Sequence, residues 1–100
     1  MSLFVFAKFA IHDRAGYERY VSLATPIFIR EKVKVHGSDD APQALTPDMA
    51  ADKNVLLEFR DKAHFDNFFA QEDYTAAAKI RNAASKMSAT LFERFEGEGH

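Results

Sequence analysis

The hydrophobic pattern of the chain first indicates strands. Residues 3–11 read LFVFAKFAI and carry a single charge, Lys8, which is typical of a central strand covered on both faces. Residues 55–60 and 90–96 alternate between two faces with a period of two, and each is predicted to be a strand. A shorter alternation over residues 32–37 has one polar face and predicts an edge strand.

Two further segments have the period of a helix. Asp13 is suited to cap the first, whose apolar positions are Tyr17, Tyr20, Val21, Ala24 and Phe28. Proline lacks the N–H that a helix interior needs, so we expect this helix to end and a new one to begin at Pro26, with Thr25 as its cap. Asp61 is expected to cap a short helical turn that contains Phe65, Phe68 and Phe69.

The second helix covers residues 72–85, which read EDYTAAAKIRNAAS. Spacing residues about 100° apart around its axis puts one set on a common face, expected to meet the sheet: Asp73, Ala76, Ala77, Ile80, Ala83, Ala84 and Met87. The facing strand positions are mostly large, so we expect the small residues to let this helix approach the sheet closely.

The order of these elements is strand, helix, strand, strand, helix, strand. It predicts an α+β, ferredoxin-like βαββαβ fold with a four-stranded antiparallel sheet and its helices on one face. The chain length suits one domain, which we expect to span residues 1–96 with a frayed tail at 97–100. Residues 38–53 are predicted to form an unusually long loop.

The strand pattern leaves apolar residues on the sheet face away from the helices. Those positions are Phe4, Phe6, Lys8, Ala10, Leu56, Glu58, Arg60, Phe92 and Arg94. An open sheet that exposes phenylalanines marks an interaction surface, and a second copy of the same chain is its commonest cover. We therefore predict a homodimer that pairs through this sheet face. Its interface is expected to include Phe4, Phe6, Lys8, Glu58 and Phe92.

Composition excludes several classes of partner and site. A formal charge of −2 gives no basic surface for nucleic acid or anionic membranes, and no apolar run reaches the length of a membrane span. With no cysteine there is no disulfide, thiolate metal site or cysteine nucleophile, which agrees with a cytoplasmic location. The histidines His12, His36 and His64 are too scattered for a recognised metal spacing, so we expect no metal. The sequence also has no phosphate-cradling glycine loop and no dinucleotide fingerprint, so we expect no tightly held cofactor.

Three segments of the chain resemble the DUF1330 family, which lies within the dimeric α/β-barrel superfamily. They read AGYERYVSLATP, NVLLEFRDKAHFDNFF and EDYTAAAKIRNAAS, and the likeness extends over nearly the whole chain. Its most specific elements are Tyr17, Tyr20, Glu58, Phe59, Tyr74, Ala77, Ala78, Lys79 and Arg81. The resemblance implies a ferredoxin-like fold, face-to-face sheet pairing, and relatives that include cofactor-free monooxygenases and small isomerases. It implies no particular catalytic residue.

Several residues have both a chemical and a structural interpretation. Lys8 and Glu58, on neighbouring central strands, are either an ion pair of the interface or part of a site. His36, beside the acidic residues Asp39 and Asp40, is either a general base or a solvated loop residue.

The arginine of the second helix also has two interpretations. Arg81, with Tyr74 and Tyr20, either binds a small anion or enolate oxygen or is a rim arginine whose stem packs on tyrosine. The candidate catalytic groups are thus Tyr17, Tyr20, His36 and Arg81.

Two functions of different classes agree with this sequence. One is the binding or transformation of a small hydrophobic, oxygenated molecule between sheet and helices, without a tightly held cofactor. The other is a dimeric module with no chemistry, in which every charged and aromatic position serves packing or an interface. A cavity on which the candidate polar groups converge would favour the first, and a solid interior the second.

Overall fold

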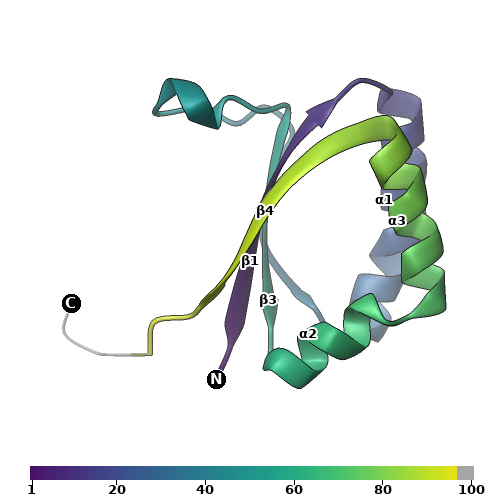
Figure 1. Cartoon of the computed structure of the whole chain (residues 1–100), viewed down its shortest axis with the longest axis vertical. Helices are drawn as coiled ribbons and strands as arrows, with labels where there is room; N and C mark the ends of the chain where they lie inside the picture. The colour runs from purple at the N-terminus through teal and green to yellow at the C-terminus, as the bar shows by residue number, and fades with distance from the viewer. Residues whose placement is uncertain (97–100) are drawn as a thin grey trace.

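The computed structural model describes residues 1–96, and the expected frayed tail at 97–100 lies outside the described residues. The fold is the predicted ferredoxin-like α+β arrangement, with a sheet on one side and helices on the other (Figure 1). In chain order the elements are β1 (Leu3–Ile11), α1 (Arg14–Arg30), β2 (Lys34–Asp39), η1, a 3-10 helix (Pro47–Met49), β3 (Lys53–Phe59), α2 (Lys62–Phe69), α3 (Glu72–Ala84) and β4 (Ser85–Glu93).

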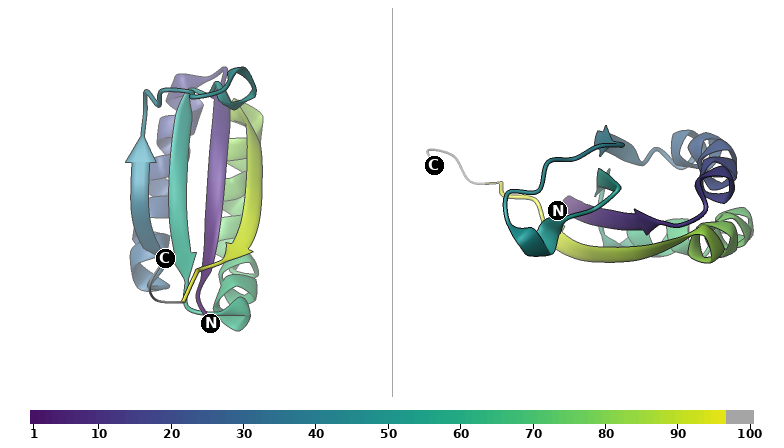
Figure 2. Two further views of the ribbon diagram at one scale, coloured as in Figure 1. Left: turned by 90° about the vertical axis from the view of Figure 1, so that its left-hand side faces the viewer. Right: turned by 90° about the horizontal axis from the view of Figure 1, so that it is seen from above.

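The four strands pair antiparallel in the order β2-β3-β1-β4. β1 and β3 are therefore central and β2 is an edge strand, as their hydrophobic patterns predicted. Viewed from the side away from the α-helices, the strands face the viewer, and only the short η1 lies on this side, at one end of the sheet (Figure 2). The inner, helix-facing residues form the predicted core of the sheet, which includes Val5, Ala7, Phe9, Leu57 and Phe59.

The first helix is continuous through Pro26, so the prediction of a break there is wrong. Asp13 caps it as expected, because its side chain accepts a hydrogen bond from the Gly16 N–H at 3.0 Å. Pro26 lies on the exposed side of α1, where water can reach the carbonyl that loses its partner. Thr25 does not cap a new helix, since its hydroxyl donates to the Val21 carbonyl one turn earlier at 2.8 Å.

The inward face of α3 differs from the predicted one. Its buried residues are Tyr74, Ala77, Arg81 and Ala84, whereas Asp73, Ala76 and Ala83 are exposed. Met87 belongs to β4, which begins at Ser85, directly after the helix and five residues before its predicted start at 90. The carbonyl of Ala84, the last residue of α3, accepts hydrogen bonds from the N–H groups of His12 and Asp13. The end of α3 is therefore bonded to the turn between β1 and α1.

Small residues bring α3 close to α1 and not, as predicted, close to the sheet. A Cβ added to Gly16 would lie only 3.1 Å from the Cβ of Ala84, tighter than ordinary carbon contacts. Ala77 and Ala24 are each 1% exposed, and Ala77 lines an outer groove with Ile27 of α1. The two helices therefore pack against each other as one layer.

The predicted pair of Lys8 and Glu58 does not form. In the register of β1 and β3, Lys8 lies opposite Asn54, and Glu58 lies opposite Phe4, four residues along the strand. Four residues of strand correspond to about 13 Å, which is too far for an ion pair. Lys8 donates instead to the carbonyl of Asp48, in the loop before β3.

The connection predicted as a loop at 38–53 is shorter and is held to the sheet. β2 extends to Asp39, so the connection covers residues 40–52. The N–H of Asp52 donates to the Phe9 carbonyl at 2.8 Å, and the Asp52 carboxylate accepts from the Ile11 N–H at 2.7 Å. None of the helices within residues 1–96 is long and apolar enough to cross a membrane.

The contact between α1 and α3 can be tested by enlarging Ala77. We expect Ala77→Leu to lower the free energy of unfolding by about 1–3 kcal/mol, because the added volume has to separate two closely packed helices. Ala83→Leu, on the exposed side of the same helix, is the matched control and should stay within about 0.5 kcal/mol of the parent. Chemical denaturation measures both. Equal stability of the two variants would show that α1 and α3 do not pack at Ala77.

Candidate functional site

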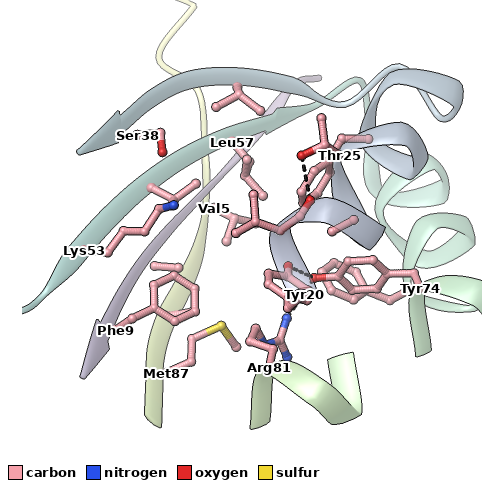
Figure 3. Close-up of a pocket in the computed structure, with 18 of the residues that line it drawn as sticks. Val5, Phe9, Tyr20, Thr25, Ser38, Lys53, Leu57, Tyr74, Arg81 and Met87 are labelled. Atoms are coloured by element: carbon pink, nitrogen blue, oxygen red, sulfur yellow. Dashed lines mark hydrogen bonds between the residues drawn. The ribbon is translucent and has the colours of Figure 1, made fainter. Parts of the chain in front are cut away.

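A cavity of about 430 Å³ lies between the inner face of the sheet and the helices, and it is partly open to solvent (Figure 3). This volume lies within the range of small-molecule sites in proteins. Most of the lining is apolar or aromatic and comes from the sheet, α1 and the α2–α3 region: Val5, Ala7, Phe9, Val21, Ala24, Phe28, Val35, Val55, Leu57, Phe65, Phe69, Met87, Ala89 and Leu91. The walls would therefore accommodate a hydrophobic molecule.

Three polar side chains from α1 and α3 meet at one wall of this cavity. The hydroxyls of Tyr20 and Tyr74 are 2.7 Å apart, and Arg81 donates from Nη1 to the Tyr74 hydroxyl at 2.8 Å. The guanidinium carbon of Arg81 also lies 5.5 Å from the centre of the Tyr20 ring. Tyr74 and Arg81 come together because residues seven apart on a helix lie on one face, two turns from each other.

Arg81 is buried, so its predicted place on the rim is wrong. The residue is 7% exposed, and its Nε–H is enclosed without a hydrogen-bond acceptor among the described residues. The other two guanidinium nitrogens donate to the Tyr74 hydroxyl and to the side-chain oxygen of Asn82, and both of these acceptors are uncharged. The guanidinium charge is thus buried beside the cavity with no carboxylate within ion-pair distance among residues 1–96.

Two of the cavity tyrosines, Tyr17 and Tyr74, are hydrogen-bond donors and not bases. Burial raises the pKa of Tyr17 well above its usual value, and the neighbouring Tyr20 raises it further. Burial also raises the pKa of Tyr74, again with a contribution from Tyr20. Both hydroxyls therefore keep their protons at neutral pH. The ring of Tyr17 lies 5.7 Å from that of Tyr20.

Lys53 is a lining residue that the sequence interpretation missed. Its Nζ lies 5.1 Å from the centre of the Tyr17 ring and 3.3 Å from a carboxylate oxygen of Asp40. The residue is 9% exposed, although it had been assigned to the loop before β3. The period of two that joins Val55 and Leu57 to the inner face continues back to Lys53, and this was the signal that could have found it.

His36 lies on the outer face of the sheet, away from the cavity. Its Nε2 is 2.6 Å from a carboxylate oxygen of Glu58, and its ring makes an edge contact with Phe4. Its carboxylate partner is thus Glu58 and not the neighbouring Asp39 or Asp40, and the interpretation of His36 as a solvated loop residue is wrong, because it lies within β2. The structure therefore brings together Tyr17, Tyr20, Tyr74 and Arg81 at the cavity but does not bring His36 to them.

Glu58 is nearly enclosed within the outer sheet face. It is 5% exposed and accepts hydrogen bonds from His36 and, at 3.2 Å, from Nη1 of Arg94. The hydrogen bond from His36 is the main cause that lowers the pKa of Glu58 to about 2, with further contributions from Ser2 and Arg94. Glu58 is consequently a carboxylate at neutral pH. Within residues 1–96, no His, Asp and Glu side chains form a group that could hold a metal ion.

The buried charge of Arg81 can be separated from its packing by two substitutions. Arg81→Met keeps a long apolar stem, so we expect its free energy of unfolding to stay within about 1 kcal/mol of the parent, because relief from burying an uncompensated charge offsets the lost hydrogen bonds. Arg81→Ala also removes the stem and should cost about 2–3 kcal/mol. Urea denaturation compares them. A loss in Arg81→Met as large as that in Arg81→Ala would identify the charge itself as a stabilising element.

Solved structures similar to this chain share its fold. RPA0582, a protein of unknown function from Rhodopseudomonas palustris, superposes with a TM-score of 0.82 at 18% identity, over 96% of this chain and 84% of that one. SnoaB from Streptomyces nogalater, described as a cofactor-independent oxygenase, has a TM-score of 0.68 at 17% identity, over 99% and 98% of the two chains. A dimeric ferredoxin-like protein of unknown function from Thermobifida fusca has a TM-score of 0.65 at 20% identity, over 92% and 90%.

Sequence comparison identifies the family. No match was found among proteins with curated descriptions. The sequence profile of one family, described as "Domain of unknown function (DUF1330)", matches residues 2–95, which include every strand and helix of the fold and every residue that lines the cavity. The chain belongs to the DUF1330 family.

Proposed function

We propose that the protein binds a small hydrophobic, oxygenated molecule in the cavity between sheet and helices. The observation that carries this proposal is the cavity of about 430 Å³ with apolar walls and a cluster of hydroxyl and guanidinium donors at one wall. Apolar lining with a few convergent polar groups is the usual form of a small-molecule site. A solid interior would have favoured a module without a ligand.

The same cavity suits a reaction in which the protein stabilises negative charge on a substrate oxygen and needs no tightly held cofactor. Its described lining residues include tyrosines, Lys53 and Arg81 but no carboxylate or histidine. Such a set can stabilise negative charge on a substrate oxygen, because donors aimed at a developing oxyanion act strongly where water is excluded. It offers no evident general base, so the substrate would be one that forms an enolate or phenolate readily. The description of SnoaB as a cofactor-independent oxygenase supports this class of activity.

We further propose that two copies pair through the outer faces of their sheets into an α/β barrel. No α-helix within residues 1–96 covers that face (Figure 2), where Phe92 is 44% exposed and makes an edge contact with Phe4. The protein from Thermobifida fusca is described as dimeric, which supports the pairing. Burial of this face would remove exposed aromatic surface from water.

Filling the cavity tests the binding proposal. Ala89 lines it from the edge strand β4, so Ala89→Phe places a ring in the space with little disturbance of the core. With 2-naphthamide as probe, we expect isothermal titration calorimetry to show binding to the parent and affinity at least about tenfold weaker for Ala89→Phe, since the two rings compete for one volume.

The control for this experiment is Ala83→Phe, which adds the same ring on the exposed side of α3. It should bind 2-naphthamide as the parent does. Equal affinity of the parent and Ala89→Phe for 2-naphthamide, or no binding of either 2-naphthamide or its anionic analogue 2-naphthoate to the folded parent, would contradict a ligand site in this cavity.

Charge placed on the outer sheet face tests the dimer. We expect the parent to sediment as a dimer at micromolar concentration and Phe6→Asp to sediment as a monomer or precipitate, because a carboxylate cannot be buried there without a partner. Ile29→Asp, which puts the same charge on the exposed side of α1, should remain dimeric. A folded, soluble monomer of the parent in sedimentation equilibrium would overturn the pairing.

A further inference from the structure

We infer that the cavity's ligand is a hydrophobic organic anion whose charged oxygen lies against Tyr20, Tyr74 and Arg81. The inference rests on the proposed function and adds the charge of the ligand and the end of the cavity that receives it. Figure 3 shows these three side chains together at one wall, with the apolar lining extending away from them.

The first argument is a count of protons. Arg81 can only donate, so the Tyr74 oxygen accepts its hydrogen bond, and the two tyrosine hydroxyls share a second bond between them. Two hydroxyl protons are present and the bond between the tyrosines uses one. Whichever tyrosine donates, the other proton has no acceptor among the described residues. A ligand oxygen is the missing acceptor, and the hydroxyl facing it is strengthened as a donor by the cation at the other end of the chain.

The second argument is the charge of Arg81. A guanidinium that is 7% exposed is costly to bury unless an anion compensates it, and its described partners are all uncharged. Lys53, the other cation of the cavity, lies 3.3 Å from the carboxylate of Asp40. The uncompensated charge is therefore at the Arg81 end, and an anion is expected there and not beside Lys53.

The third argument is that the site has donors in excess. Besides the unmatched tyrosine proton, the Arg81 Nε–H is buried without an acceptor among residues 1–96. The raised pKa of Tyr17 and Tyr74 keeps these hydroxyls protonated and so unable to supply the negative charge themselves. A carboxylate, enolate or phenolate oxygen, with several lone pairs, matches this arrangement.

A matched pair of probes tests the charge. The anion 2-naphthoate and the neutral 2-naphthamide have nearly the same shape, and their affinities for the parent protein at neutral pH can be compared by isothermal titration calorimetry. We expect 2-naphthoate to bind at least about tenfold more tightly, as a hydrogen-bonded charge in a partly buried site should. Arg81→Gln should abolish this preference. Lys79→Gln, which removes the same charge from the exposed side of α3, should retain it.

A second measurement on the parent protein does not depend on a variant that folds. The Nε–H resonance of Arg81 in a ¹⁵N-resolved NMR spectrum should shift when 2-naphthoate is added and shift much less with 2-naphthamide. Equal affinity of the two probes, or an unmoved Arg81 resonance, would overturn the anion inference while leaving ligand binding in the cavity intact. Failure of both probes to bind the folded parent would overturn the proposed function as well.

Discussion

The close packing of α1 on α3 is the constraint on which the rest of the structure depends. Gly16 and Ala84 leave no room for a larger side chain at their contact, and Ala77 is buried nearby. With their small residues turned toward each other, the two helices place their tyrosines toward the sheet. Aromatic rings of these helices, including those of Tyr17, Tyr20 and Tyr74, line the space between the two layers. The cavity between the layers follows from this division of small and large residues.

The sequence was sufficient for the strands, the central and edge positions, and the caps at Asp13 and Asp61, because these depend on local patterns. It was insufficient for the inner face of α3. A helical period shows which residues share a face, but Ala77 and Ala84 suit contact with a helix as well as contact with a sheet. The burial of Arg81 was also missed, because the helical period does not show which neighbouring element packs on a residue. A position at the rim and a position in the interior have the same spacing along the helix.

The remaining differences come from strand register, which a single sequence does not give. Lys8 and Glu58 were correctly placed on one face, yet four residues of offset separate them. The bulge in β2 between Val35 and Gly37 similarly decides which β2 residues accompany each position of β3. His36 finds Glu58 across the strands and not the acidic residues next to it in sequence. The register of strand pairing thus decides which polar residues of a sheet are partners. The alternation of hydrophobic and polar residues along one strand does not show this register.

The placement of the aromatic residues also makes the protein its own spectroscopic reporter. The chain contains three tyrosines and no tryptophan, and all three tyrosines line the cavity. Its near-ultraviolet tyrosine absorption and its intrinsic fluorescence therefore originate from one site, without a background from elsewhere in the fold. Since the pKa values of Tyr17 and Tyr74 lie well above the usual range while the chain is folded, the tyrosinate absorption of these two residues during an alkaline titration would follow the opening of the cavity wall.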